Sequence, residues 1–202
     1  MSQLIKDNAI AADEWVRVTP PTFGDEVVRK QAGKVVLFKL TGEETFTAKQ
    51  IAATEIPATG KILLPLTVWQ ANKDALASRM DAGDVGIVLA THEPIESLIE
   101  AFEDINTLPL IAIFVERFAD GRNFTLANLL RTRYGFKNEL RAVGDVLRDQ
   151  LFFLKRSGFN SYLIRADRNA QEALASLNDF SQPYQGAVDD ALPVWRRLER
   201  QA

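Results

Sequence analysis

The 202-residue sequence contains no cysteine, one histidine and two methionines. Without cysteine there is no disulfide framework, no thiol nucleophile and no cysteine-ligated zinc or iron–sulfur site. A single histidine likewise excludes a site built from several imidazole ligands. Neither a Gly-x-Gly-x-x-Gly fingerprint nor a P-loop occurs, so the sequence predicts no nucleotide site, and no metal or other cofactor is expected.

Long apolar runs are also missing. The longest, such as residues 110–115, are far below the roughly 20 residues that span a bilayer. Lys6, Asp7, Asp13 and Glu14 lie where a signal peptide would have its apolar region. With 47% hydrophobic and 25% charged residues, the composition is typical of a soluble globular protein. We therefore expect a cytoplasmic protein that does not bind membranes.

From residue 61 onward, short apolar segments alternate with amphipathic ones. The expected strands are residues 62–66, 85–90, 110–115, 140–143 and 161–165. An amphipathic segment follows each of them, most clearly where Ile95, Leu98, Ile99, Phe102 and Ile105 share one helical face. Five βα units predict an α/β fold with a mainly parallel sheet. Periodicity leaves open whether this sheet is doubly wound or a partial barrel.

Three portions of the chain are expected. Residues 1–60 form a small β-rich N-terminal portion, with a hairpin within residues 4–18 and a strand at 34–40. Residues 61–185 form the α/β domain, and 186–202 a C-terminal tail with a helical turn near Trp195. Within the α/β domain, Thr67 and Asn169 are expected to cap helices, and another helix is expected to begin at Val146.

Charge is unevenly distributed along the chain. The net charge of −3 combines −7 over residues 1–116, +6 over 117–168 and −2 over 169–202. Nine of the eleven cations in the middle segment are arginines, which bind oxyanions with two parallel hydrogen bonds. The segment also supplies loops at the carboxyl ends of strands, where α/β proteins place functional residues. An anionic ligand or a negatively charged partner is predicted. The alternative is that these arginines pair with carboxylates on solvated helix faces.

Residues 118–159, FADGRNFTLANLLRTRYGFKNELRAVGDVLRDQLFFLKRSGF, carry a dense motif. They resemble the bacterial domain-of-unknown-function family 934, and weaker similarity extends over residues 61–185. The resemblance implies an oxidoreductase of sulfite reduction, encoded beside the sulfite reductase haemoprotein of assimilatory sulfur metabolism. Because redox chemistry needs an electron carrier and this chain has no motif for one, a partner must supply it.

Motif positions and strand-end loops together give the candidate ligand-binding residues. They are Asp120, Gly121, Arg122, Arg131, Glu139, Arg141, Gly144, Asp145, Asp149 and Gln150. In this hypothesis Arg122, Arg141 and Arg131 hold a small oxyanion such as sulfite, and the helix start after Gly144 adds amide donors. Arg141 interrupts a buried strand, so it requires a defined partner. No catalytic residue is predicted.

The sequence thus predicts an accessory protein of assimilatory sulfite reduction that binds an anionic ligand or a partner reductase. One alternative is an enzyme with Mg²⁺ held by Glu116, Asp145 and Asp167, acting on a small anionic substrate. Another is a non-catalytic, oligomeric interaction module. The partners to consider are the sulfite reductase haemoprotein and a second copy of the chain. Nucleic acid is not expected, because the overall charge is negative and no known binding module occurs.

Overall fold

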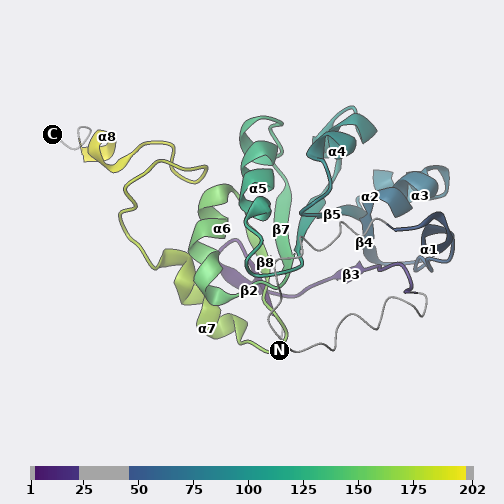
Figure 1. Cartoon of the computed structure of the whole chain (residues 1–202), viewed down its shortest axis with the longest axis horizontal. Coiled ribbons are helices and arrows are strands. Elements are labelled where there is room, and N and C mark those ends of the chain that lie inside the picture. Colours follow the sequence, from purple (N-terminus) through teal and green to yellow (C-terminus); the bar gives the residue numbers. More distant parts are fainter. Residues whose placement is uncertain (1–2, 23–45, 199–202) are drawn as a thin grey trace, which may run out of the picture.

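The computed structural model describes residues 3–22 and 46–198. Eight strands form one sheet in the order β2-β1-β8-β7-β6-β5-β4-β3 (Figure 1). The strands are β1 (Leu4–Lys6), β2 (Ala9–Ala11), β3 (Trp15–Arg17), β4 (Lys61–Pro65), β5 (Val85–Ala90), β6 (Leu110–Val115), β7 (Glu139–Gly144) and β8 (Ser161–Leu163). All neighbours from β3 to β8 are parallel, while β1 pairs antiparallel with β2 and β8.

The sheet curls into a half-barrel. From β3 to β8 the spatial order follows the chain order, so every crossover advances in the same direction. With right-handed crossovers, such an order places the connecting helices on one face of the sheet. The α/β prediction is confirmed, and of the two architectures left open the structure has the partial barrel.

Helices follow the strands along the chain. They are α1 (Ala48–Ala52), α2 (Leu66–Ala71), α3 (Lys73–Asp81), α4 (Ile95–Ala101), α5 (Arg122–Thr132), α6 (Leu151–Ser157), α7 (Ala170–Leu174) and α8 (Val194–Leu198), with 3-10 turns at Ile105–Thr107, Arg148–Gln150 and Ala175–Asn178. Among the described residues, no helix has the length and apolarity needed to cross a membrane.

Side chains are buried on both faces of the sheet. The larger cluster joins the helices to the outer face of the strands and includes Leu64, Ile87 and Ile113. A smaller cluster lies on the inner, concave face and comprises Leu63, Val88, Leu110, Ala112 and Val143. Burial on both faces explains why the central strands are apolar throughout rather than alternating.

The N-terminal strands share this sheet with the α/β domain. The expected hairpin is present as β1 and β2, turning at Asp7 and Asn8, whose φ angles are +48° and +63°. Residues 15–17 do not extend the hairpin, however, because they form edge strand β3 beside β4. The strand expected at 34–40 lies outside the described residues.

Helix boundaries differ from expectation in three places. Thr67 does not cap a helix, because α2 already begins at Leu66 and the Thr67 hydroxyl has no hydrogen-bond partner in the part of the chain that the structure describes. The helix expected to reach Ile105 ends at Ala101, where Phe102 turns extended and stacks on Trp69 with ring centroids 4.4 Å apart. The helix expected from Val146 begins only at Leu151. The Asn169 cap is confirmed, since its side chain accepts from the Gln171 amide at 2.9 Å.

Candidate functional site

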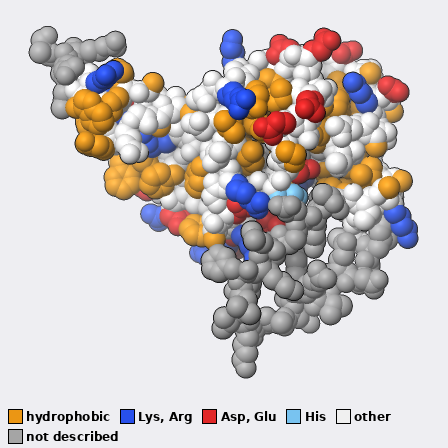
Figure 2. Space-filling model, turned by 45° about the horizontal axis from the view of Figure 1, so that its top comes forward, with side chains coloured by type: hydrophobic (Ala, Val, Ile, Leu, Met, Phe, Trp, Pro, Cys, Tyr) orange, Lys and Arg blue, Asp and Glu red, His pale blue; other side chains and the backbone are white. Residues whose placement is uncertain are grey.

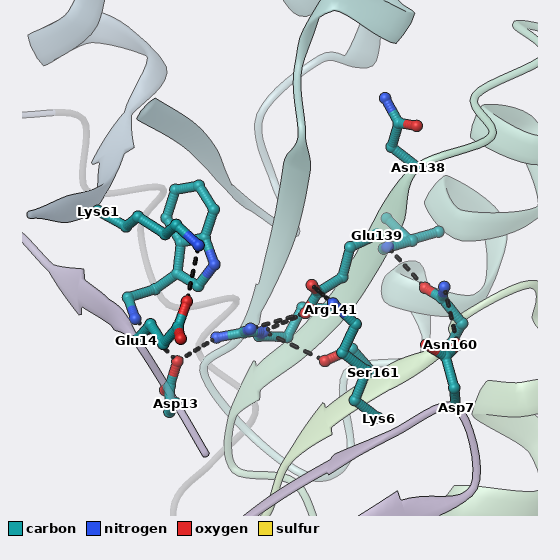
Figure 3. A network of polar contacts seen from close by, with 12 residues as sticks. Lys6, Asp7, Asp13, Glu14, Lys61, Asn138, Glu139, Arg141, Asn160 and Ser161 are labelled. Carbon is teal, nitrogen blue, oxygen red and sulfur yellow. Dashed lines mark hydrogen bonds and ion pairs between the residues drawn. The ribbon is translucent and has the colours of Figure 1, made fainter. Parts of the chain in front are cut away.

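A buried polar network crosses the inner face of the half-barrel (Figure 3). Arg141 is 2% exposed, and its Nε and Nη2 donate to Glu139 Oε1 at 2.9 and 2.7 Å. Its Nη1 donates to Asp13 Oδ1 at 2.8 Å, and Nε also lies 3.2 Å from Ser161 Oγ. Lys6 Nζ donates to Glu139 Oε2 at 2.7 Å. The defined partner predicted for Arg141 is therefore confirmed.

This network connects β7 to β8, to β1 and to the segment before β3. Burial alone would raise the pKa of Glu139, but its contacts with Lys6, Arg141 and Ser161 lower that pKa below its ordinary value. All three guanidinium nitrogens of Arg141 already donate to protein oxygens. Arg141 and Glu139 thus hold strands together, and the geometry gives neither of them a free position toward a ligand.

Arg131 has a different set of partners. Its Nε donates to the Gly158 carbonyl at 2.8 Å, and its Nη1 to the carbonyls of Phe136 and Asn138 at 2.7 and 2.9 Å. Nη2 donates to Asn160 Oδ1 at 3.2 Å. Arg131 therefore ties the end of α5 to the loops that lead into β7 and β8.

Arg122 lies at the start of α5, beyond the carboxyl end of β6. Its Nε and Nη2 each donate to Asp120 at 3.0 Å, and its backbone amide donates to the same carboxylate at 3.1 Å. The Thr91 hydroxyl donates to the other side of that carboxylate, Oδ2. Burial opposes ionisation of Asp120, but these hydrogen bonds bring its pKa down to about 2. Gly121 lies between the pair, as the residue that precedes α5.

Two further motif residues hold the loop between β6 and α5. Asp145 Oδ2 accepts from the Phe118 amide at 2.8 Å, and Gln150 Nε2 donates to the Phe118 carbonyl at 3.1 Å. The other oxygen of Asp145 accepts from Arg165 Nη1 at 2.7 Å. Gly144 has φ +101°, and a Cβ there would lie 2.3 Å from the Val115 carbonyl oxygen. The motif therefore fixes the backbone of residues 116–121 at the carboxyl edge of the sheet.

The structure does not bring the ten candidate residues into one site. Arg122, Arg131 and Arg141 have different partners, and Asp149 is exposed in a 3-10 turn. The amide donors expected after Gly144 are engaged, because the Asp145 amide donates to the Val115 carbonyl and the Leu147 amide to Gln150. The expected free helix start is therefore wrong, and the helix begins later.

The three carboxylates considered for Mg²⁺ do not form a group either. Arg165 donates to Asp167 at 2.6 and 2.9 Å while also binding Asp145. In residues 3–22 and 46–198, no set of three acidic or histidine side chains is grouped closely enough to hold a metal ion. Arg165 thus neutralises two of the three proposed ligands.

A cleft of 330 Å³ lies at the carboxyl ends of β4, β5 and β6. Its polar lining comes from Arg17, Thr19, Thr67, Thr91, His92, Glu93 and Glu116, and its apolar lining includes Pro65, Val88 and Phe114. Thr91 joins this cleft to the motif, since it also binds Asp120. Because the parallel strands β3 to β8 all end at this edge, the cleft occupies the position where βα barrels bind ligands.

Arg17 and Thr67 supply side-chain donors in the cleft that have no acceptor among the described residues. Arg17 reaches across the concave face until its Cζ lies 3.9 Å from the centroid of the Phe114 ring. Packing around it lowers the pKa of Arg17, but its side chain remains exposed to solvent, and among the described residues no carboxylate pairs with it. The Thr67 hydroxyl is buried and has no hydrogen-bond partner in the described chain. Of the two, only the Thr67 hydroxyl is both buried and without a partner in the described chain.

Glu93 supplies an acidic group in the same cleft. Its Oε2 accepts from the Ala90 amide at 2.6 Å. Burial raises the pKa of Glu93, and the Ala90 hydrogen bond and nearby His92 only partly oppose that effect. Glu93 therefore takes up a proton at a higher pH than an exposed glutamate does.

Sequence reasoning did not identify Arg17 or Thr67 as site residues. Arg17 lies in a three-residue strand, and Thr67 was interpreted as a helix cap. One indication was available for Arg17, which stands between Val16 and Val18 in an alternating segment and so takes the face opposite to theirs.

The comparisons with known proteins give a family but no characterised relative. No curated protein matches the sequence. A family model described as "Bacterial protein of unknown function (DUF934)" matches residues 86–195, which is more than half of the chain. The match includes the motif and strands β5 to β8, whereas Arg17 and Thr67 precede it. The chain belongs to the DUF934 family.

Proposed function

We propose that this chain is an accessory protein of sulfite reduction that binds a small oxyanion in the strand-end cleft. The observation that carries the proposal is the guanidinium of Arg17, which lines the cleft over the Phe114 ring, is open to solvent and has no carboxylate partner among the described residues. Because this guanidinium is accessible and not engaged by a described carboxylate, it can donate to an anion that enters the cleft. The Thr67 hydroxyl, buried in the same lining, is a second donor.

Sulfite is the first oxyanion to test, because the motif at residues 118–159 resembles a family linked to sulfite reduction. The motif itself supports the cleft indirectly, through the hydrogen bond that the Thr91 hydroxyl donates to Asp120. The proposed role needs no redox group in this chain. The partner reductase would carry the electrons, and this protein would hold or deliver the anion.

The carboxyl groups in the cleft predict how affinity depends on pH. Glu93 and Glu116 add negative charge that repels an anion. Because the pKa of Glu93 is raised, it loses its charge before an exposed glutamate would as pH falls. Anion binding should therefore strengthen on acidification, and Glu93→Gln should remove that part of the pH dependence.

Calorimetry with sulfite, and with sulfate and chloride for comparison, tests the proposal. Arg17→Gln should weaken sulfite binding by about tenfold or more, since a hydrogen bond to a charged group contributes about 1.5 to 3 kcal/mol. Arg133→Gln is the matched control, because Arg133 also lies over an aromatic ring, that of Tyr134, but outside the cleft. Absence of anion binding, or equal affinity in both variants, would refute the proposal.

A second candidate is an enzyme that uses Glu93 as a general acid or base on a small anionic substrate. The raised pKa of Glu93 in a strand-end cleft favours this function. Its test is turnover rather than binding: Glu93→Gln would abolish turnover of a small anion while Arg17→Gln raised KM. The enzyme function is excluded if sulfite binds but Glu93→Gln leaves turnover unchanged, both in the chain alone and in its complex with the reductase. The accessory role is then the remaining function.

A further inference from the structure

The last described part of the chain is a folded arm whose end projects away from the half-barrel. We define the arm as residues 181–198. In Figure 1 its helix α8 lies far from α6 and α7. The Val194 amide donates to the Tyr184 carbonyl at 3.0 Å, and Arg197 donates to the carbonyls of Leu192 and Pro183 at 2.7 and 2.9 Å. These contacts close the arm on itself into a hook.

The root of the arm is attached to α6. The Val188 amide donates to the Arg156 carbonyl at 3.0 Å, and Arg156 Nη1 lies 3.4 Å from Asp189 Oδ1. Gly158, at the end of α6, contributes to the fit, because a Cβ there would lie 3.3 Å from Val188. The arm is therefore held in one direction relative to the body rather than trailing from it.

Aromatic side chains are exposed both on the arm and on the body beside its root. On the arm, Tyr184 and Trp195 are 69% and 48% exposed, with ring centroids 5.1 Å apart. On the body, Phe153 of α6 and Phe180 are 55% and 60% exposed. Figure 2 shows hydrophobic side chains gathered along the arm and the adjoining surface. Such a set of large exposed aromatic groups is typical of an interaction surface.

We propose that this surface joins two copies of the chain, with the arm of each copy packed on the exposed Phe153 and Phe180 of the other. One chain carries both parts of the interface: a projecting aromatic hook and an exposed aromatic patch beside the place where that hook is anchored. If two copies exchange arms about a twofold axis, the aromatic hook of each copy covers the aromatic patch of the other, so all four surfaces are buried. A different partner protein would cover only one of them or need a surface complementary to both.

Charge complementarity supports the same partner. Arg196 on α8 is exposed and has no ion pair within the described chain, and neither has Asp179, which precedes Phe180 on the body. Arg197, by contrast, is engaged by Asp190 within the arm at 3.1 Å. When Trp195 of one copy lies on Phe180 of the other, Arg196 and Asp179 are the charges placed to pair.

The oligomeric state of the full chain, measured by sedimentation velocity over a series of concentrations, tests this inference. The wild type should sediment as a dimer of the 22.6-kDa chain. Trp195→Ala should raise the dimer dissociation constant by about tenfold or more, as expected for loss of a buried aromatic anchor. Phe118→Ser is the matched control, because Phe118 is 45% exposed but lies at the carboxyl edge of the sheet and should leave the dimer unchanged.

Exchanging the two charges distinguishes this specific pairing from nonspecific association through the arm. Asp179→Arg and Arg196→Asp should each weaken the dimer, and the double variant should recover it. Far-ultraviolet circular dichroism and the melting temperature establish that each variant is folded. A wild type that stays monomeric, or a dimer that Trp195→Ala and both charge variants leave intact, would overturn the inference. The inference would also be overturned by a complex in which the arm is covered by a reductase and not by a second copy of the chain.

Discussion

Replacing Arg141 with methionine should destabilise the fold severely. The guanidinium is 2% exposed and satisfies Glu139, Asp13 and Ser161 at once. Methionine fills much of the same volume but leaves the carboxylate of Glu139, which is 8% exposed, without its main partner. The cost therefore comes from a buried charge that has lost its countercharge, not from a cavity.

The structure sets the expected magnitude. Breaking a buried ion pair by removing one partner costs about 3 to 5 kcal/mol. Here the lower end applies, because Lys6, 40% exposed, still pairs with Glu139 at 2.7 Å. We therefore expect a loss of about 3 kcal/mol in the free energy of unfolding. Adding Glu139→Gln to Arg141→Met should cost less than the sum of the two single changes, because the double variant leaves no carboxylate at position 139 to lose its partner.

Urea denaturation followed by circular dichroism measures these differences. The midpoint should fall markedly for Arg141→Met, with little change in slope. Arg133→Gln, a change at an exposed arginine, should move the midpoint by far less. If Arg141→Met and Arg133→Gln had the same midpoint, the network would not stabilise the inner face, and the reasoning would be refuted.

Three further changes test other contacts. Gly144→Ala should lower the unfolding free energy by about 3 kcal/mol or more, because at φ +101° its Cβ would clash with neighbouring atoms. Gly135→Ala should lower it by only about 1 kcal/mol, because Gly135 has φ +66° but open space around the new Cβ. Comparable losses in the two variants would contradict this difference. Asp120→Asn should flatten the dependence of the unfolding free energy on pH in the acid range. The folded pKa of Asp120 is about 2 and its ordinary value is 3.8, so its ionised form stabilises the fold above pH 3.8 and this stabilisation is lost as the pH falls toward 2. An unchanged pH dependence would count against this role of Asp120. Gln150→Leu should speed amide exchange at Phe118 and its loop neighbours, and unaltered protection would mean that the loop is held by other contacts.

Much of the fold could be predicted from the sequence, because a strand buried on both faces has a distinctive composition. Residues 85–90 and 110–115 were expected as strands with the bounds that the structure has. The half-barrel was not decided, since the same βα pattern suits a sheet whose crossovers reverse direction. Strand β3 was missed because three residues are too few to show a period, and its partner β4 lies more than 40 residues further along the chain.

Less of the candidate site could be predicted. The motif residues are specific, but their partners are mainly backbone groups from distant segments, such as the Phe118 amide for Asp145. A sequence does not show that a carboxylate already has such a partner. The need of Arg141 for a countercharge was predictable from its place in an apolar strand. The cleft was not predictable, because Arg17 lies beside Phe114 only once the curved sheet brings strands β3 and β6 together over its concave face.

The central claim is that Arg17 makes the strand-end cleft an oxyanion site. Its most direct test is isothermal titration of sulfite into the wild type, Arg17→Gln and Arg133→Gln at one pH and ionic strength. The account predicts saturable binding to the wild type and to Arg133→Gln, and binding at least about tenfold weaker to Arg17→Gln. Absence of heat in all three proteins, or equal affinity in all three, would contradict it.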